Sequence, residues 1–433
     1  MNYQQTIDYL YNTLPMFSRM GSAAFKKDLT NTLLLCERLD NPQKKFKSIH
    51  VAGTNGKGSV SHMLAAIFQT AGYKTGLYTS PHLYDFRERI RVNGVMCDED
   101  FIIDFTQKIK PAIEEIQPSF FEITVAMAFD YFAQQKVDIA IIEVGLGGRL
   151  DSTNVIIPEL SIITNIGWDH MNLLGNTLEE IAYEKAGIIK EKIPVVIGEK
   201  KPETENVFRN SASQKNAPLY FAEDNFSVTN YKLENDSIEI SVAHKKFPII
   251  NYQLDLAGIY QTKNILTVLQ AVELMKEWKI SQQNIQSALK KVKQLTGLHG
   301  RWEAIHQEPM IVLEVAHNKD GIEQMLQHLQ NISFNKLHIV IGMVKDKDAD
   351  SVLELLPKEA NYYFTQAHIP RALDAQVLKE KALPLSLKGN SFDNVNEAIQ
   401  QTLIHAAKDD LIIVCGSIFL VAEVNKELVA QQA

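Results

Sequence analysis

The sequence predicts an α/β protein, in which a parallel-sheet domain with a phosphate-binding loop precedes a smaller α/β domain. Short apolar runs that end in glycine or a small polar residue alternate with helical patterns over most of the chain. Such alternation is typical of a parallel sheet with helices on both faces. The first apolar run leads into a glycine-rich turn with a lysine, at residues 53–59. A second series of apolar runs begins after residue 300.

The first part of the chain contains five candidate strands. They are SIHVAG at 48–53, KTGLYTS at 74–80, VDIAIIEVG at 137–145, LSIITNIG at 160–167 and PVVIG at 194–198. We expect amphipathic helices between them, for example at 59–72 and 123–135. Ligands of such sheets lie beyond the carboxyl ends of the strands, so the residues that close each run are the main functional candidates.

The pattern changes from about residue 225 to residue 247. Polar and apolar residues alternate there, which predicts an antiparallel hairpin or meander. A helical stretch at 262–278 follows, and Gly297 and Gly300 then interrupt the pattern. We therefore predict a domain boundary near Leu298, with one domain at 1–297 and a smaller one at 298–433. Further candidate strands are MIVLEVAHN at 310–318, KLHIVIGMV at 336–344, NYYFTQ at 361–366 and LIIVCGS at 411–417.

Composition excludes several classes of protein. The 433 residues are 45% hydrophobic and 22% charged, which is the balance of a globular protein with a sizeable core. A formal net charge of -8 disfavours a nucleic-acid binder that neutralises phosphates. No apolar run is long enough for a membrane helix, and the N-terminus does not resemble a signal peptide. The three cysteines are widely spaced, so we expect reduced thiols and a cytoplasmic location.

The glycine-rich turn is the sharpest local signal of function. Glycines allow backbone N–H groups to curl around a phosphate, and the N-terminus of the following helix, expected near Ser59, adds partial positive charge. Lys57 would neutralise the outer phosphate oxygens, and the Ser59 hydroxyl would lie near a magnesium ion. The spacing is unusual because a glycine separates Lys57 from Ser59. The nucleotide-binding candidates of this loop are Gly53, Thr54, Asn55, Gly56, Lys57, Gly58 and Ser59.

Two strand ends beside this loop carry candidate metal ligands. Glu143 closes a buried strand, and a carboxylate at that place can hold Mg²⁺ directly or through water. His170 follows the next strand and would lie at the same edge of the sheet. In the glycine-rich segment after Glu143, Asn154 could reach a nucleotide. Lys185 ends a helical stretch, and by itself it reads as a solvated lysine at a helix C-terminus.

A series of motifs resembles the folylpolyglutamate synthase and dihydrofolate synthase family of the Mur-ligase superfamily. The motifs occur in the same order as in that family and span nearly the whole chain. They are VAGTNGKGS at 51–59, YTSPHL at 78–83, IIEVGLGGRLDSTNVI at 141–156, ITNIGWDHMNLLG at 163–175, EKAGIIK at 184–190, GIYQTKNILT at 258–267, GRWE at 300–303, AHN at 316–318, GMVKDKD at 342–348 and PRALD at 370–374.

The resemblance implies roles for further residues. ATP would lie between the N-terminal P-loop domain and a C-terminal Rossmann-like domain. Ser80, Glu143 and His170 fall on magnesium-binding positions of the family, and Lys185 falls where the family often carries a carbamylated lysine. Nucleotide contacts would come from Asn264, Arg301, Glu314 and His317. Glu314 departs from the family, which usually has Asp three residues before this histidine.

The segment Ser80–Arg91 combines aromatic and cationic residues that suit a pterin and an anionic glutamyl tail. The substrate-binding candidates are His82, Arg87, Arg89, Asp151 and Asn154. The implied activity is an ATP-dependent amide ligase that joins L-glutamate to dihydropteroate, to folates or to both, through an acyl phosphate. A monomer without nucleic-acid or membrane partners is expected.

Three other interpretations compete with this one. A Mur-type ligase for a UDP-linked precursor would carry a further domain before the phosphate loop, for which Gly53 comes too early. A P-loop kinase or NTPase switch would explain the loop but not the second α/β domain. A nucleotide-binding scaffold without catalysis would have lost its metal site, whereas Lys57, Glu143 and His170 are all present.

Overall fold

An eight-stranded sheet forms the centre of the N-terminal part of the chain. The computed structural model describes residues 1–16, 21, 28–234 and 236–432. The sheet has the order β4-β3-β2-β5-β1-β6-β7-β8. Six of these strands are parallel to one another, namely β2, β5, β1, β6, β7 and β8. Antiparallel β3 and β4 extend one edge. The strands are β1 (Lys47–Ala52), β2 (Thr75–Tyr78), β3 (Ile90–Val92), β4 (Val95–Met96), β5 (Ile139–Glu143), β6 (Leu160–Ile163), β7 (Val195–Ile197) and β8 (Leu219–Phe221).

Residues alternate between the two faces of this sheet, as the period of a strand requires. In β5, Ile139 and Ile141 belong to one buried cluster, whereas Ala140 and Ile142 belong to another on the opposite face. Both faces are thus covered, and this explains the continuous apolar runs in the sequence. The helices of this part are α1 (Tyr3–Thr13), α3 (Thr30–Arg38), α4 (Lys57–Thr70), α5 (Glu99–Ile116), α6 (Phe120–Gln135), α7 (Met171–Leu174), α8 (Leu178–Ala186) and α9 (Pro202–Gln214).

Helix α4 is buried on all sides, so the amphipathic pattern predicted for it is wrong. Every residue from Gly58 to Phe68 is buried. The helix lies between the sheet and three later helices, α10 (Gln261–Leu274), α11 (Gln282–Leu289) and α12 (Val292–Thr296). A helix that is covered on both sides carries apolar residues all around. It begins at Lys57, two residues before the predicted start.

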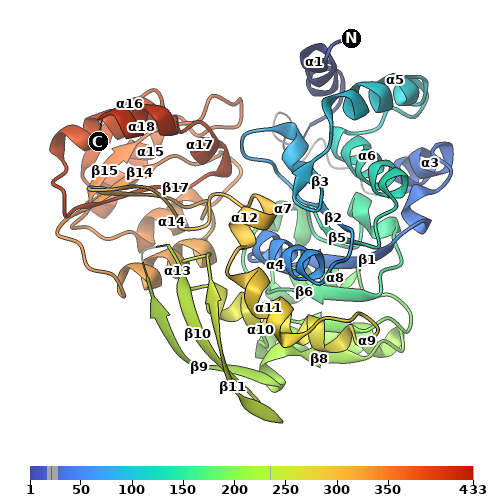
Figure 1. Ribbon diagram of the computed structural model, residues 1–433. Coiled ribbons are helices and arrows are strands. Elements are labelled where there is room, and N and C mark those ends of the chain that lie inside the picture. Colours follow the sequence, from blue (N-terminus) through green and yellow to red (C-terminus); the bar gives the residue numbers. More distant parts are fainter. Residues whose placement is uncertain (17–20, 22–27, 235, 433) are drawn as a thin grey trace.

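The predicted antiparallel meander is confirmed and has three strands. They are β9 (Phe226–Leu233), β10 (Ile238–His244) and β11 (Phe247–Leu254), with β10 in the middle. In Figure 1 these strands extend away from the rest of the molecule as long arrows. Alternate residues of β10, namely Ile238, Ile240 and Val242, join the core that contains α4.

A second α/β unit follows Gly300 and lies beside the first (Figure 1). Its six-stranded sheet has the order β12-β13-β17-β14-β15-β16 and is parallel except for β12. The strands are β12 (Glu303–Gln307), β13 (Met310–Leu313), β14 (Leu337–Ile341), β15 (Asn361–Phe364), β16 (Gly389–Ser391) and β17 (Leu411–Cys415). The helices are α13 (Lys319–Leu329), α14 (Ala349–Leu355), α15 (Ala375–Ala382), α16 (Val395–His405), α17 (Ile418–Ala422) and α18 (Lys426–Gln432).

The predicted α/β class, with a large sheet followed by a smaller α/β unit, is confirmed. The exact division of the chain after residue 297 stays a prediction. Within the described ranges, no helix has the length and hydropathy that crossing a membrane would require.

Candidate active site

The phosphate loop lies at the carboxyl end of β1 and is held by two later segments of the chain. Gly53 has a φ of +147°, and a Cβ there would lie 1.9 Å from Oγ1 of Thr164. A Cβ at Gly56, whose φ is +84°, would lie 2.4 Å from Oδ1 of Asn264. Any larger residue would therefore clash with the side chains that pack on the loop. Lys57 starts α4, and its Nζ donates to the carbonyl oxygens of residues 53 and 54, each at 3.1 Å.

Other loop side chains are occupied within the protein. The Ser59 hydroxyl is buried and accepts a hydrogen bond from Nε2 of Gln261 at 3.2 Å, and Asn264 Nδ2 donates to Oε1 of that glutamine at 2.8 Å. Thr54 Oγ1 donates to the Gly167 carbonyl and accepts from the Gly167 amide, at 3.2 and 3.0 Å. These bonds shape the loop, and the nucleotide-binding roles of its residues stay predictions.

Glu143 lies at the end of β5, next to the phosphate loop. The side chain is buried, and its one hydrogen bond with the described residues is a long one, 3.4 Å, from the Ser80 amide to Oε2. Burial raises the pKa of this carboxyl to about 7, although Lys57 and Arg301 counteract the rise. A Cβ at Gly58 would lie 3.3 Å from Nη2 of Arg301 and 3.9 Å from Oε1 of Glu143. One carboxylate and two cations therefore converge on the first turn of α4.

Lys185 is buried, so its interpretation as a solvated helix-end lysine is wrong. It is 4% exposed, and its Nζ donates to the Gly53 carbonyl at 3.0 Å. Burial, assisted by Lys57, lowers the pKa of Lys185 to about 7. A neutral amine is therefore available here near neutral pH, which carbamylation requires. Gly53 and Lys185 are far apart in the sequence, so this contact could not be predicted from it.

A polar cluster beside the phosphate loop joins the two domains. Asp169 pairs with the ammonium group of Lys347, and its Oδ2 lies 3.6 Å from Nε2 of His317. Burial alone would raise the pKa of Asp169, but Lys347 and the nearby histidines hold it well below the usual value. Asn55 and Asn318 exchange amide hydrogen bonds of 3.1 and 3.2 Å across the same junction.

Sequence reasoning did not assign Asp169, Lys347 and Asn318. Each stands inside a quoted motif, and Asp169 precedes the predicted ligand His170. The cluster also affects that ligand, because Nζ of Lys347 lies 3.2 Å from Nε2 of His170. Burial lowers the pKa of His170 to about 3. The imidazole is thus neutral, as a metal ligand must be, but a cation at Nε2 would require Lys347 to move.

Glu314 forms hydrogen bonds with both domains. Its Oε2 accepts hydrogen bonds from the Tyr260 hydroxyl at 2.8 Å and the Trp302 amide at 3.0 Å, and its Oε1 accepts from the Ala316 amide at 3.2 Å. The longer side chain thus reaches back to the segment that connects the two domains. The nucleotide contact expected for this position stays a prediction.

The predicted substrate residues fall into two groups. His82 and Arg89 lie together, with Nε of Arg89 donating to Nδ1 of His82 at 2.7 Å. Arg87 instead pairs with Asp85 at 2.7 Å and Glu99 at 3.3 Å.

The other two candidates, Asp151 and Asn154, form hydrogen bonds that hold the glycine-rich segment after β5. Asp151 accepts from the Leu146 amide at 2.8 Å and from the Thr153 hydroxyl at 2.5 Å. Asn154 Nδ2 donates to the carbonyls of Arg149 and Gly187, at 3.0 and 3.1 Å. Both residues thus fix the backbone that lies next to Lys185.

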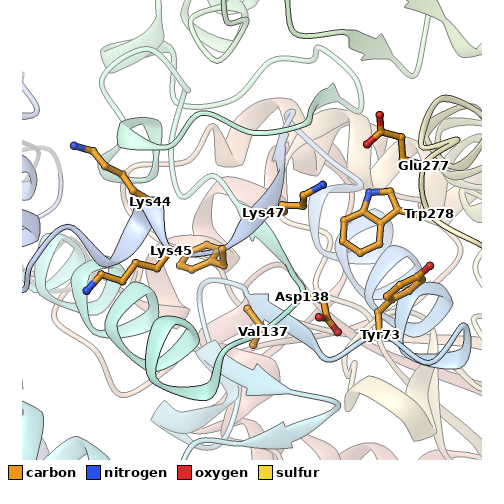
Figure 2. Close-up of a pocket in the computed structure, with 9 residues that line it drawn as sticks. Lys44, Lys45, Lys47, Tyr73, Val137, Asp138, Glu277 and Trp278 are labelled. Carbon is orange, nitrogen blue, oxygen red and sulfur yellow. The ribbon is translucent and has the colours of Figure 1, made fainter.

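A narrow cavity of 60 Å³ opens at the junction. Its walls come from the first turn of α4, the segment after β2, the end of β5 and the interdomain segment. They comprise Gly58, His62, Thr79, Ser80, Pro81, His82, Leu83, Glu88, Arg91, Glu143, Gly297, Leu298, His299, Arg301 and Ile418. A larger hollow of 620 Å³ lies at the opposite, amino ends of the strands. Figure 2 shows that Lys44 and Lys45 there point away from Tyr73 and Trp278, so we do not assign a site to it.

Magnesium fits the cavity by the chemistry of its walls. The described residues contain no group of three or more His, Cys, Asp or Glu side chains that would hold a metal by themselves. Mg²⁺ usually needs only one or two protein carboxylates, because water and phosphate oxygens complete its shell. Glu143 supplies a carboxylate that protein donors leave largely unsatisfied.

Both domains match family models of Mur ligases. Residues 51–272 match the Mur ligase middle domain, and residues 300–418 match the Mur ligase glutamate ligase domain. The chain is therefore a Mur ligase in architecture. The glutamate ligase match also separates it from a P-loop kinase or an NTPase switch, neither of which accounts for the second domain.

Comparison with similar proteins identifies the family within the Mur ligases to which the chain belongs. The dihydrofolate synthase/folylpolyglutamate synthase of Bacillus subtilis is 35% identical over 98% of this chain and 99% of its own length. The folylpolyglutamate synthase of Lacticaseibacillus casei is 31% identical, with 99% of each chain covered. A structure of Escherichia coli FolC in complex with DHPP and ADP superposes with a TM-score of 0.87 at 30% identity, covering 100% of this chain and 99% of that one. This chain belongs to the dihydrofolate synthase/folylpolyglutamate synthase family.

Proposed function

We propose that the chain is an ATP-dependent ligase that joins L-glutamate to dihydropteroate and to glutamylated tetrahydrofolate. The convergence of Lys57, Glu143 and Arg301 on the first turn of α4 carries the proposal. This is an arrangement for positioning a triphosphate and neutralising its charge, which is most of what phosphoryl transfer requires. A complex of a similar synthase from Mycobacterium tuberculosis with ADP and AMPPCP, at a TM-score of 0.86 and 28% identity, supports the use of ATP.

The reaction would proceed in two steps. A carboxylate oxygen of the acceptor attacks the γ-phosphorus of ATP, the bond to ADP breaks, and an acyl phosphate forms. The amine of L-glutamate then attacks the acyl carbon, and phosphate leaves as the amide forms. Lys57 and the loop amides would hold the phosphates, and Arg301 would neutralise charge on the transferred group. The cavity between the domains would shield the acyl phosphate from water.

We assign two magnesium positions to this site. Ser80 and Glu143 would hold one ion, and His170 would hold the second once Lys347 has moved away from its Nε2. Mg²⁺ supplies neutralisation of phosphate charge when it is bound. Lys185, as a carbamate, would add a buried anion beside the loop.

The remaining proposals concern the setting of the enzyme. We propose a monomer in the cytoplasm that has no nucleic-acid partner. The thiols of Cys36, Cys97 and Cys415 support a reducing compartment, because all three are free and buried. The net charge of -8 supports the absence of a nucleic-acid partner.

The test measures phosphate release from ATP with Mg²⁺ and L-glutamate, comparing 7,8-dihydropteroate with tetrahydrofolate as acceptor. We expect release with both, and a loss of about 100-fold or more in the Lys57→Met variant. Activity with dihydropteroate alone would restrict the chain to dihydrofolate synthesis. Inactivity with both acceptors in a folded protein that binds ATP would overturn the proposal. A UDP-linked peptide precursor serves as the negative control.

A further inference from the structure

Arg91 is a buried cation in the wall of the interdomain cavity. It lies on β3, is 8% exposed and lines the same cavity as Ser80 and Glu143. Its guanidinium packs against the interdomain segment, since a Cβ at Gly297 would lie 2.9 Å from Cζ of Arg91. Gly297 has a φ of +68°, a conformation that glycine adopts without strain. The position of the guanidinium is therefore fixed by the backbone on its far side.

Within the part of the chain that the structure describes, no acid forms an ion pair with this guanidinium, and burial lowers its pKa although Glu88 and Asp85 counteract the effect from a distance. Its recorded hydrogen bond runs from Nη1 to the Gly94 carbonyl at 3.1 Å. Its Nε is buried and has no hydrogen-bond partner. Arg91 also forms no ion pair with any described residue, unlike Arg87, four residues earlier in the chain.

The nearby groups that could have served as partners are otherwise occupied. Glu88 lines the same cavity, but its carboxylate accepts hydrogen bonds from the amides of residues 83, 84 and 85, at 2.8, 2.9 and 2.9 Å. His62 is buried and neutral, and its Nδ1 lies 2.8 Å from Oγ1 of Thr296. Burial of an uncompensated charge is costly, so a buried cation without a partner in a cavity wall indicates an anionic ligand.

The chemistry of the proposed reaction limits which anion this is. The triphosphate already has Lys57, the loop amides and Arg301. The reacting carboxylate of the acceptor must lie close to the γ-phosphate, at the Ser80 and Glu143 end of the cavity. An acceptor that ends in glutamate carries a second, unreactive α-carboxylate on the same residue. Dihydropteroate carries no such group, because its single carboxylate is the one that reacts.

We propose that Arg91 binds the α-carboxylate of the terminal glutamate of a glutamylated acceptor. The inference rests on the proposed function and makes Arg91 a residue that distinguishes the two acceptors. Bound there, the α-carboxylate gains the charged donor, and the γ-carboxylate of the same residue remains free to reach the phosphate. Dihydropteroate would be turned over without this contact.

The test compares KM and kcat of the unmodified chain with those of Arg91→Met and Arg91→Lys, using tetrahydrofolate and 7,8-dihydropteroate as acceptors. In Arg91→Met we expect KM for tetrahydrofolate to rise about 10- to 100-fold, the usual effect of losing a hydrogen bond to a charged group. KM for dihydropteroate and for ATP should stay close to the unmodified values. Arg91→Lys should be intermediate, because it keeps the charge without the fork of donors.

Controls separate binding from stability. Arg209→Met removes an exposed arginine that pairs with Glu205 at 2.6 Å on α9, and it should change neither KM. Arg91→Met should not lower the melting temperature, because the side chain that it removes has no acid partner. Equal losses with both acceptors, a raised KM for ATP, or turnover confined to dihydropteroate in the unmodified chain would each overturn the inference. Inactivity of the unmodified chain with both acceptors would overturn the proposed function itself.

Discussion

Lys185 has a buried ammonium group that is poorly solvated, and this makes its charge sensitive to pH. Its pKa, lowered to about 7 by burial, means that the protonated form prevails below pH 7 and the neutral amine above it. Only the neutral amine takes up CO₂. We therefore expect kcat to rise between pH 6 and pH 8 in the unmodified chain. Lys185→Arg, which stays charged, should lose about 100-fold in kcat at pH 8.

The anionic role of Lys185 has a separate test. In Lys185→Ala, added acetate should restore part of the activity, because a free carboxylate can occupy the place of the carbamate. The same acetate should leave Lys57→Ala inactive. Unimpaired turnover by Lys185→Arg would contradict the role of a carbamate.

The positions of some site residues could be predicted from the sequence, and those of others could not. Glu143 and His170 follow β5 and β6, which lie on either side of β1, and the topology of a parallel sheet brings strand ends to one edge. The burial of Lys185 depends on a contact with Gly53, 132 residues away. No local pattern encodes such a contact. The pairing of Arg87 with Glu99 could not be predicted either, because Glu99 approaches it from another element.

At the scale of elements, Glu303 connects β12 to the C-terminal helix α18 and to the interdomain segment. Its carboxylate lies 2.7 Å from Nζ of Lys426 and 3.0 Å from Nδ1 of His299, and it accepts from the Gly300 amide at 2.7 Å. Although burial opposes the shift, these partners lower its pKa to about 2 from 4.5. The carboxylate thus contributes stability that is fully present above pH 4.5 and is lost as the pH falls toward 2.

We expect Glu303→Gln to lower the free energy of unfolding by about 2 to 3 kcal/mol at pH 7. The difference from the unmodified chain should shrink as the pH falls from 4.5 to 3, since Glu303 then takes up a proton in the unfolded chain but stays ionised in the folded one. Urea unfolding at a series of pH values measures this. Glu115→Gln, which removes the partner of Arg38 in an exposed ion pair, should show little pH dependence. A Glu303→Gln difference that does not vary with pH would refute the linkage.

The sequence predicted whether most elements are helices or strands better than it predicted which other elements pack against them. Strands buried on both faces produce apolar runs, and the antiparallel β9 to β11 produce alternation, so both kinds of sheet were predictable. Helix α4 differed, because its outer side is covered by α10, α11 and α12, more than 190 residues later in the chain.

At the scale of the whole molecule, polar and charged side chains join the two domains, beside apolar contacts of Leu83 and Ala257 with the core of the second domain. Lys347 from the second domain reaches Asp169 of the first, and Asn318 reaches Asn55. An interface of this kind resembles a transient one, which suits domains that must part to admit substrates and close during reaction. The ion pair is the strongest of these contacts, because its two side chains are only 8% and 10% exposed.

Removal of Lys347 should therefore open the molecule. In Lys347→Met the Asp169 carboxylate would remain buried without its cation, which costs about 3 to 5 kcal/mol when a buried pair is broken. Since the pair lies between domains, separation of the domains relieves this cost by admitting water. Small-angle X-ray scattering should show a larger radius of gyration, and KM for ATP should rise.

Asp169→Asn combined with Lys347→Met should restore compactness, because no charge is then left buried. Lys381→Met, which breaks an exposed pair with Asp350 within the second domain, is the matched control. Identical scattering from Lys347→Met and the unmodified chain would show that the pair does not hold the domains together.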